Sequence, residues 1–160
     1  MSSTNSQAPS TPTEHHAGLM AAVAEVGELS FFGFVDPPAP GTFEARAAAA
    51  GPWLCARVDY AGGEHGAVQV AVPEALARRL VSAFIGEPEP ADTGEGLEDL
   101  LGEFANMICG LWLTRTRPDA VFSLGRPAVT RMPAGWAPSA TSVVAATFND
   151  QPLAVWIARM

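Results

Sequence analysis

The amino-acid sequence predicts an α+β fold in which helices pack on a largely antiparallel β-sheet. Three segments carry apolar residues at helical spacing, and Gly- and Pro-containing turns join several shorter strand candidates. The elements follow the order helix, strands, helix, helix, strands. This order is typical of helices that lie against an antiparallel sheet.

Length and composition indicate one globular domain. The chain has 160 residues, of which 48% are hydrophobic and 16% charged, so it can bury a core. Residues 1–14 are mostly Ser, Thr, Pro and Asn. Because they have little to bury, we expect a disordered tail there. Residues 15–160 then form the single domain.

Charge excludes several classes of function. Nine basic residues, all Arg, oppose 17 acidic residues, so a nucleic acid or an anionic membrane is not the expected partner. The lack of Lys excludes Schiff-base chemistry, a P-loop and a Ser–Lys dyad. No apolar run approaches the roughly 18 residues of a membrane span, and the N-terminus does not resemble a signal peptide. We therefore expect a cytoplasmic protein.

The first half of the chain is predicted to form two helices and three strands. The strands are expected at residues 42–49, 53–60 and 67–72 as an antiparallel meander. Thr13 is a suitable N-cap for a helix that ends near residue 31 or 32, and the Pro-rich residues 36–41 should stop regular structure. Pro73 suits the first position of a second helix, and Gly86 suits its end.

The second half is predicted to form a long helix and four strands. The helix runs from about residue 92 or 95, where 92–95 offer a capping arrangement, to residue 115. Arg115 and Arg117 complement the helix dipole in this interpretation, which we favour over ligand binding, and Pro118 ends the helix. The strands are expected at 121–124, 128–132, 141–148 and 153–158, with a turn at 149–152.

A short internal similarity suggests two related halves. Residues 24–28 (Ala-Glu-Val-Gly-Glu) resemble residues 102–106 (Gly-Glu-Phe-Ala-Asn), and each segment opens a helix-then-strands half. The sequence therefore predicts a pseudo-symmetric arrangement of α–β halves. In the first half, Glu28 occupies the position that matches Asn106.

The long helix separates into two stripes at about 100° per residue. Its apolar stripe should face the core and comprises Leu97, Leu101, Phe104, Ile108 and Trp112. The opposite stripe, which we call the docking ridge, comprises Asp99, Glu103, Asn106 and Gly110. Between the stripes lie Gly102, Ala105 and Cys109, which are small enough for another surface to come close.

Familiar catalytic and metal constellations are missing from the sequence. His15 and His16 lie beside the tail and His65 lies in a turn, so neither a triad nor a metal site is expected. Cys55 and Cys109 form no C-x-x-C motif and are expected to be reduced, with Cys109 a packing residue.

The docking ridge has the groups for a different chemistry. The Asn106 carboxamide can donate and accept hydrogen bonds at once and so hold a water at a fixed angle. Phosphoryl transfer depends on such positioning and on charge neutralisation. Because the sequence offers no Lys and no metal cage, the cation and metal should come from a partner, whose Lys or Arg would pair with Glu103.

These residues resemble a known signature. The run Asp99-x-x-x-Glu103-x-x-Asn106, with Gly110 after it and Pro127 further on, is similar to that of CheC/CheX/FliY-type phosphatases. The single motif in the second half most resembles CheX, and the element order agrees from about residue 15. The resemblance implies the CheC/CheX type of fold and dephosphorylation of a phosphorylated CheY-like receiver domain, in chemotaxis or another two-component pathway.

The resemblance also implies roles for the ridge residues. Asn106 would orient the attacking water and Glu103 would pair with a receiver lysine, while Asp99, Gly102 and Gly110 would support the partner interface. Mg²⁺ would belong to the receiver, with no cofactor bound by this chain, and a homodimer is implied. Glu28 argues against a second site, because a carboxylate there would repel the phosphoryl group.

Two other functions stay open at this point. The ridge could serve a non-catalytic adaptor that holds a receiver or a flagellar-switch partner, or it could be an ordinary solvated face. The Glu103/Asn106 pair favours the enzyme, because a pure adaptor does not need the carboxamide.

Overall fold

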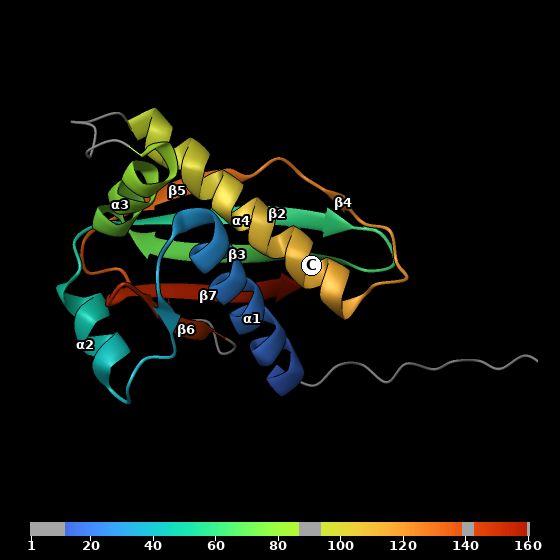
Figure 1. Cartoon of the computed structure of the whole chain (residues 1–160), viewed down its shortest axis with the longest axis horizontal. Helices are drawn as coiled ribbons and strands as arrows, with labels where there is room; N and C mark the ends of the chain where they lie inside the picture. The colour runs from blue at the N-terminus through green and yellow to red at the C-terminus, as the bar shows by residue number, and fades with distance from the viewer. Residues whose placement is uncertain (1–11, 87–93, 139–142, 160) are drawn as a thin grey trace, which may run out of the picture.

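The computed structural model describes residues 12–86, 94–138 and 143–159 (Figure 1). Its helices are α1 (Pro12–Phe31), α2 (Thr42–Ala49), α3 (Glu74–Ile85) and α4 (Gly94–Thr116). Its strands are β1 (Val35–Asp36), β2 (Trp53–Ala61), β3 (His65–Pro73), β4 (Ser123–Leu124), β5 (Ala128–Met132), β6 (Val144–Phe148) and β7 (Gln151–Arg159). Within these residues, no helix is long and apolar enough to cross a membrane.

The strands form one sheet in which every neighbouring pair is antiparallel. The order is β1-β6-β7-β3-β2, and β4 and β5 both pair with the free edge of β2. The predicted antiparallel sheet is therefore confirmed.

The strand order also agrees with the predicted pseudo-symmetric arrangement of the two halves. Short β1 crosses over to pair with β6 of the second half, and β4 and β5 cross over to pair with β2 of the first half. The strand order is symmetric: if β1 is exchanged with β4 and β5, β2 with β6, and β3 with β7, the same order is read from the opposite edge of the sheet. The two long helices, α1 and α4, contact each other on the same face of the sheet (Figure 1).

Side-chain alternation along the central strands separates two cores. Leu54, Val70 and Val155 point to the face covered by α1, α3 and α4, where the larger core forms. Trp53 and Trp156 point to the other face, where α2 contributes a smaller core. The long helix α4 lies over the β2 side of the sheet, where it contacts β2, β3 and β5.

The apolar stripe of α4 is buried as predicted. Leu97, Leu101, Phe104, Ile108 and Trp112 are each at most 2% exposed. The Phe104 ring meets the Phe31 ring of α1 edge-on, with centroids 4.9 Å apart. This geometry suits the ring quadrupoles and joins the two long helices.

The first predicted strand is wrong, because residues 42–49 form helix α2. The segment is rich in Ala with Glu and Arg, which favour helix over strand. Phe43 and Ala47, four residues apart, are buried on one side of the helix, as helical spacing requires. Just before α2, residues 37–41 lie in neither a helix nor a strand, in line with the predicted stop at 36–41. Asp36 belongs to β1, which pairs Val35 with Phe148.

Several element ends differ from the predicted ones. Helix α1 begins at Pro12, so Thr13 lies inside it and residues 12–14 are not part of a tail, while residues 1–11 lie outside the described residues. Pro73 is the N-cap of α3 instead of its first residue, and Gly86 ends α3 with φ 70°, as expected. The expected cap at 92–95 falls partly outside the described residues, since α4 begins at Gly94.

The last hairpin is tighter than predicted. Asn149 and Asp150 alone form the turn, with φ of 46° and 68°, and β7 already begins at Gln151. Two successive residues at positive φ suit the right-handed twist of the flanking strands. The predicted strand 121–124 is reduced to β4, and β6 begins at Val144, with 141–142 outside the described residues.

Phe104→Ala tests whether this ring anchors α4. Removing a fully buried ring leaves a cavity, so we expect the free energy of unfolding to fall by about 3–5 kcal/mol. Urea denaturation monitored by circular dichroism measures this loss. Thr114→Ala, on the exposed side of the same helix, is the matched control and should change it by less than about 0.5 kcal/mol. An equally small loss for Phe104→Ala would show that the ring does not anchor the helix.

Candidate functional site

The docking ridge lies on the accessible side of α4. Asp99 and Glu103 are exposed, and Asn106 and Gly110 are partly buried. The opposite side of the same helix is packed into the larger core. Because α4 is held along its length by this packing, the spacing of Glu103 and Asn106 is set by a rigid helix.

The small residues beside the ridge contact this chain's own loop. Gly102 is buried, and a Cβ atom at this position would lie only 3.0 Å from the Pro127 Cβ. A Cβ at Gly110 would lie 3.7 Å from the Leu124 side chain. The segment between β4 and β5 therefore approaches α4 closely, and Gly102 permits this approach. Any partner contact of Gly102 stays a prediction.

A cleft forms where this segment meets the ridge. It has a volume of about 230 Å³, and we call it the ridge cleft. Its lining residues are Glu98, Asp99, Gly102, Glu103, Arg126, Pro127 and Val129. Asn106 is not among them but follows Gly102 and Glu103 by one helical turn. The structure thus brings Asp99, Gly102 and Glu103 to one cleft, with Asn106 and Gly110 further along the helix.

Arg126, like Glu98 and Val129, lines the cleft but was missed by sequence reasoning. It lies on the β4–β5 segment, far along the chain from Asp99 and Glu103. The available signal was its place directly before Pro127, the residue that completes the motif.

Ion pairs fix the α3 side of the ridge cleft. Arg131 of β5 bonds Glu98 of α4 (Nε to Oε1, 3.3 Å) and also lies 3.5 Å from a Glu74 carboxylate oxygen of α3. Arg78 bonds the same carboxylate at 3.1 Å. Within the described part of the chain, Asp99 and Glu103 have no such partner. Glu98 is therefore a structural carboxylate, and the ridge carboxylates are left for other contacts.

Arg115 and Arg117 have structural partners, in line with the preferred interpretation. Arg115 pairs with Glu25 of α1, and the Arg117 Nε lies 2.9 Å from a Glu64 carboxylate oxygen. Glu25 is the first-half counterpart of Glu103, so its carboxylate is engaged within the chain. Glu28, the counterpart of Asn106, is exposed.

The thiols are poor nucleophiles. Burial raises the pKa of Cys109 to about 12 and that of Cys55 to about 11. Both thiols are therefore protonated near neutral pH, and Cys109 is completely buried beneath the ridge. Within the described ranges, no group of three or more His, Cys, Asp or Glu side chains is placed to hold a metal ion.

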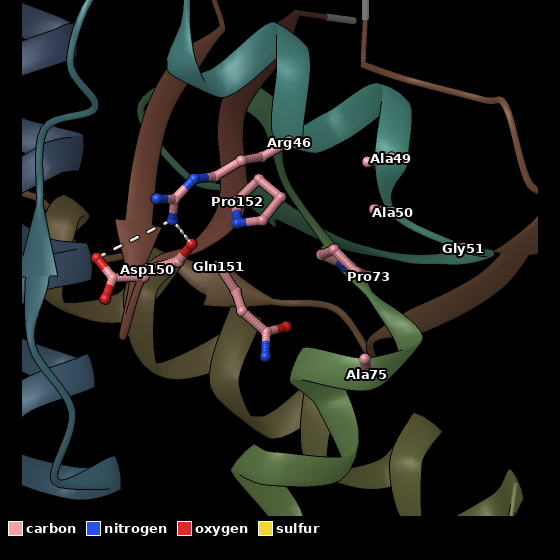
Figure 2. Close-up of a pocket in the computed structure, with 9 residues that line it drawn as sticks. All are labelled: Arg46, Ala49, Ala50, Gly51, Pro73, Ala75, Asp150, Gln151 and Pro152. Carbon is pink, nitrogen blue, oxygen red and sulfur yellow. Dashed lines mark hydrogen bonds and ion pairs between the residues drawn. The ribbon is translucent and has the colours of Figure 1, made fainter.

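A larger pocket lies away from the ridge. Figure 2 shows it, with a volume of about 450 Å³, between α2, the start of α3 and the β6–β7 turn. Small side chains and prolines form most of its wall, and none of the predicted site residues lines it. Its one guanidinium, from Arg46, bonds the Asp150 carbonyl oxygen and lies 4.0 Å from the Asp150 carboxylate. This pocket therefore offers no free charge to a substrate.

Solved structures resemble this fold along nearly the whole chain. The chemotaxis protein CheX from Vibrio vulnificus has a TM-score of 0.70 at 18% identity, covering 94% of this chain and 99% of that one. CheX from Desulfovibrio desulfuricans has a TM-score of 0.66 at 21% identity, covering 91% and 98%. The CheX–CheY–BeF3–Mg²⁺ complex from Borrelia burgdorferi contains a chain with a TM-score of 0.61 at 17% identity, covering 91% and 98%.

These identities are low, so the likenesses show the shared fold alone. A comparison with curated proteins gives no match. The family model for the chemotaxis phosphatase CheX matches residues 54–139, more than half of the chain and all of the docking ridge. The chain therefore belongs to the CheX family of chemotaxis phosphatases.

Proposed function

We propose that this protein hydrolyses the aspartyl phosphate of a CheY-like response-regulator receiver domain. The observation that carries the proposal is the placement of Glu103 and Asn106, one turn apart on the accessible side of a helix that is buried on its other side. Membership of the family supports the reaction. The likeness to a chain of the CheX–CheY–BeF3–Mg²⁺ complex supports the kind of partner.

Asn106 is the catalytic residue in this proposal. Its carboxamide holds a water in line with the phosphorus–oxygen bond of the aspartyl phosphate. The water oxygen bonds to phosphorus as that bond breaks, giving inorganic phosphate and a free receiver carboxylate. The carboxamide contributes position and not a base, since it does not take up a proton near neutral pH. The Mg²⁺ belongs to the receiver and neutralises the phosphoryl oxygens.

Glu103 anchors the receiver and Asp99 supports it. The exposed Glu103 carboxylate, which has no ion-pair partner among the described residues, is suited to a receiver lysine. Asp99 precedes it by one turn and adds negative charge to the same surface. The homodimer that the resemblance implies stays a prediction.

Asn106→Ala tests the catalytic step. Losing one positioned polar group should lower kcat by roughly 10²-fold, by analogy with other positioned donors, while complex formation survives. Loss of label from a panel of phosphorylated receivers measures turnover. Glu28→Ala, at the matching position of α1, is the control and should leave turnover unchanged. Unchanged turnover in Asn106→Ala would contradict catalysis and favour a receiver-binding adaptor.

Glu103→Ala tests the anchor. Removing one partner of a charge pair should weaken binding about tenfold or more, with the larger change in KM. Glu103→Gln keeps the shape without the charge and should lose nearly as much. Titration of the receiver measured by fluorescence anisotropy gives the affinity. An affinity equal to that of the native protein in both variants would exclude Glu103 as the anchor.

Cys109→Ala distinguishes this reaction from cysteine-based phosphoryl transfer. Because burial raises the pKa of Cys109 to about 12, its thiolate is scarce throughout neutral pH. We expect turnover within about twofold of the native value and a loss of stability on the order of 1 kcal/mol from the smaller side chain. Abolished turnover in a variant that still unfolds cooperatively would point to a thiolate mechanism.

A further inference from the structure

Arg126 brings a positive charge to a cleft that otherwise presents carboxylates. It is exposed and lines the ridge cleft together with Asp99 and Glu103. Within the ranges that the structure describes, its guanidinium forms no ion pair. It is therefore placed to meet a group that comes from outside the chain.

The other arginines near the ridge are already engaged. Arg131 is held by Glu98 and Glu74, and Arg115 is held by Glu25. Neutralisation of Glu98 by Arg131 leaves the ridge cleft with two free carboxylates on α4 and one free guanidinium on the opposite wall. A partner that fits this cleft must present both signs of charge.

The backbone that carries Arg126 is held in place against α4. Pro127, the next residue, packs against Gly102 so closely that a Cβ there would lie 3.0 Å away. A residue before proline is also restricted to extended conformations. The position of Arg126 relative to the ridge is thus set by packing and by local sterics.

We propose that Arg126 binds an oxyanion of the docked receiver and so helps to determine which receivers are substrates. This inference rests on the proposed function. A guanidinium recognises a phosphoryl or carboxylate group through paired hydrogen bonds. It also offsets the repulsion that the ridge carboxylates exert on an anionic site as the receiver approaches. Because Asn106 does not line the ridge cleft, we expect Arg126 to act on the binding of the receiver and not on the orientation of the water.

The test compares Arg126→Ala and Arg126→Lys with the native protein on a phosphorylated receiver that the native protein accepts. We expect KM to rise about tenfold or more in Arg126→Ala with kcat within about twofold, and Arg126→Lys to recover part of the loss. KM should also depend less steeply on salt in Arg126→Ala. Arg79→Ala is the matched control, since Arg79 is exposed on α3 and lies outside the ridge cleft.

Affinity for the same receiver in two forms identifies the oxyanion. If Arg126 binds the phosphoryl group, the variant loses affinity only for the receiver loaded with BeF3 and Mg²⁺. If it binds a carboxylate, the affinity for the unphosphorylated receiver falls as well.

Three results would overturn the inference. The first is an unchanged KM and affinity in Arg126→Ala, and the second is a lower kcat at unchanged KM. The third is an equal loss in Arg126→Ala and Arg126→Lys together with a lower melting temperature, which indicates a structural role. A native protein that neither binds nor dephosphorylates any receiver overturns the proposed function itself, and the inference with it.

Discussion

Packing of α4 against the sheet determines where every ridge group lies. Phe104 and Ile108 bind the helix to the larger core, and the edge-on contact of Phe104 with Phe31 joins it to α1. Since a helix held along its length has few ways to move, Glu103 and Asn106 keep one relative position. Under the proposed function Asn106 orients a water and needs this rigidity, because a displacement of about 1 Å can cost a large part of the rate.

The β4–β5 segment adds a second constraint on the ridge. Its Pro127 rests on Gly102, and its Leu124 approaches Gly110. In this fold Gly102 and Gly110 explain how a loop comes near enough to the helix to form the ridge cleft. The proline of the motif is thus a packing partner, and the residue before it acquires a fixed place beside the carboxylates. Motif residues that carry no reactive group thus shape the site by setting how closely the β4–β5 segment approaches α4.

Periodicity made much of this structure predictable. The spacing of Leu97, Leu101 and Phe104 placed one side of α4 in the core, and therefore placed Glu103 and Asn106 on the other side. The predicted strand at 42–49 is wrong because its Ala, Glu and Arg favour helix, and Phe43 and Ala47 show helical spacing. Arg126 was missed because only tertiary packing brings it to α4, and its one sequence signal was its place directly before Pro127. Element ends depend on single residues such as Thr13, and these were predicted least well.

The two halves have a similar arrangement of helices and strands, but only the second half carries the Glu–Asn pair of the motif. In α4 the motif carboxylate of Glu103 faces outward, whereas in α1 its counterpart Glu25 is occupied by Arg115 from α4. Within the part of the chain that the structure describes, the carboxylate at this position is free on α4, whereas on α1 it forms an ion pair that joins the two halves. Under the proposed function, each copy of the chain therefore has a valency of one receiver, although its fold contains two similar halves.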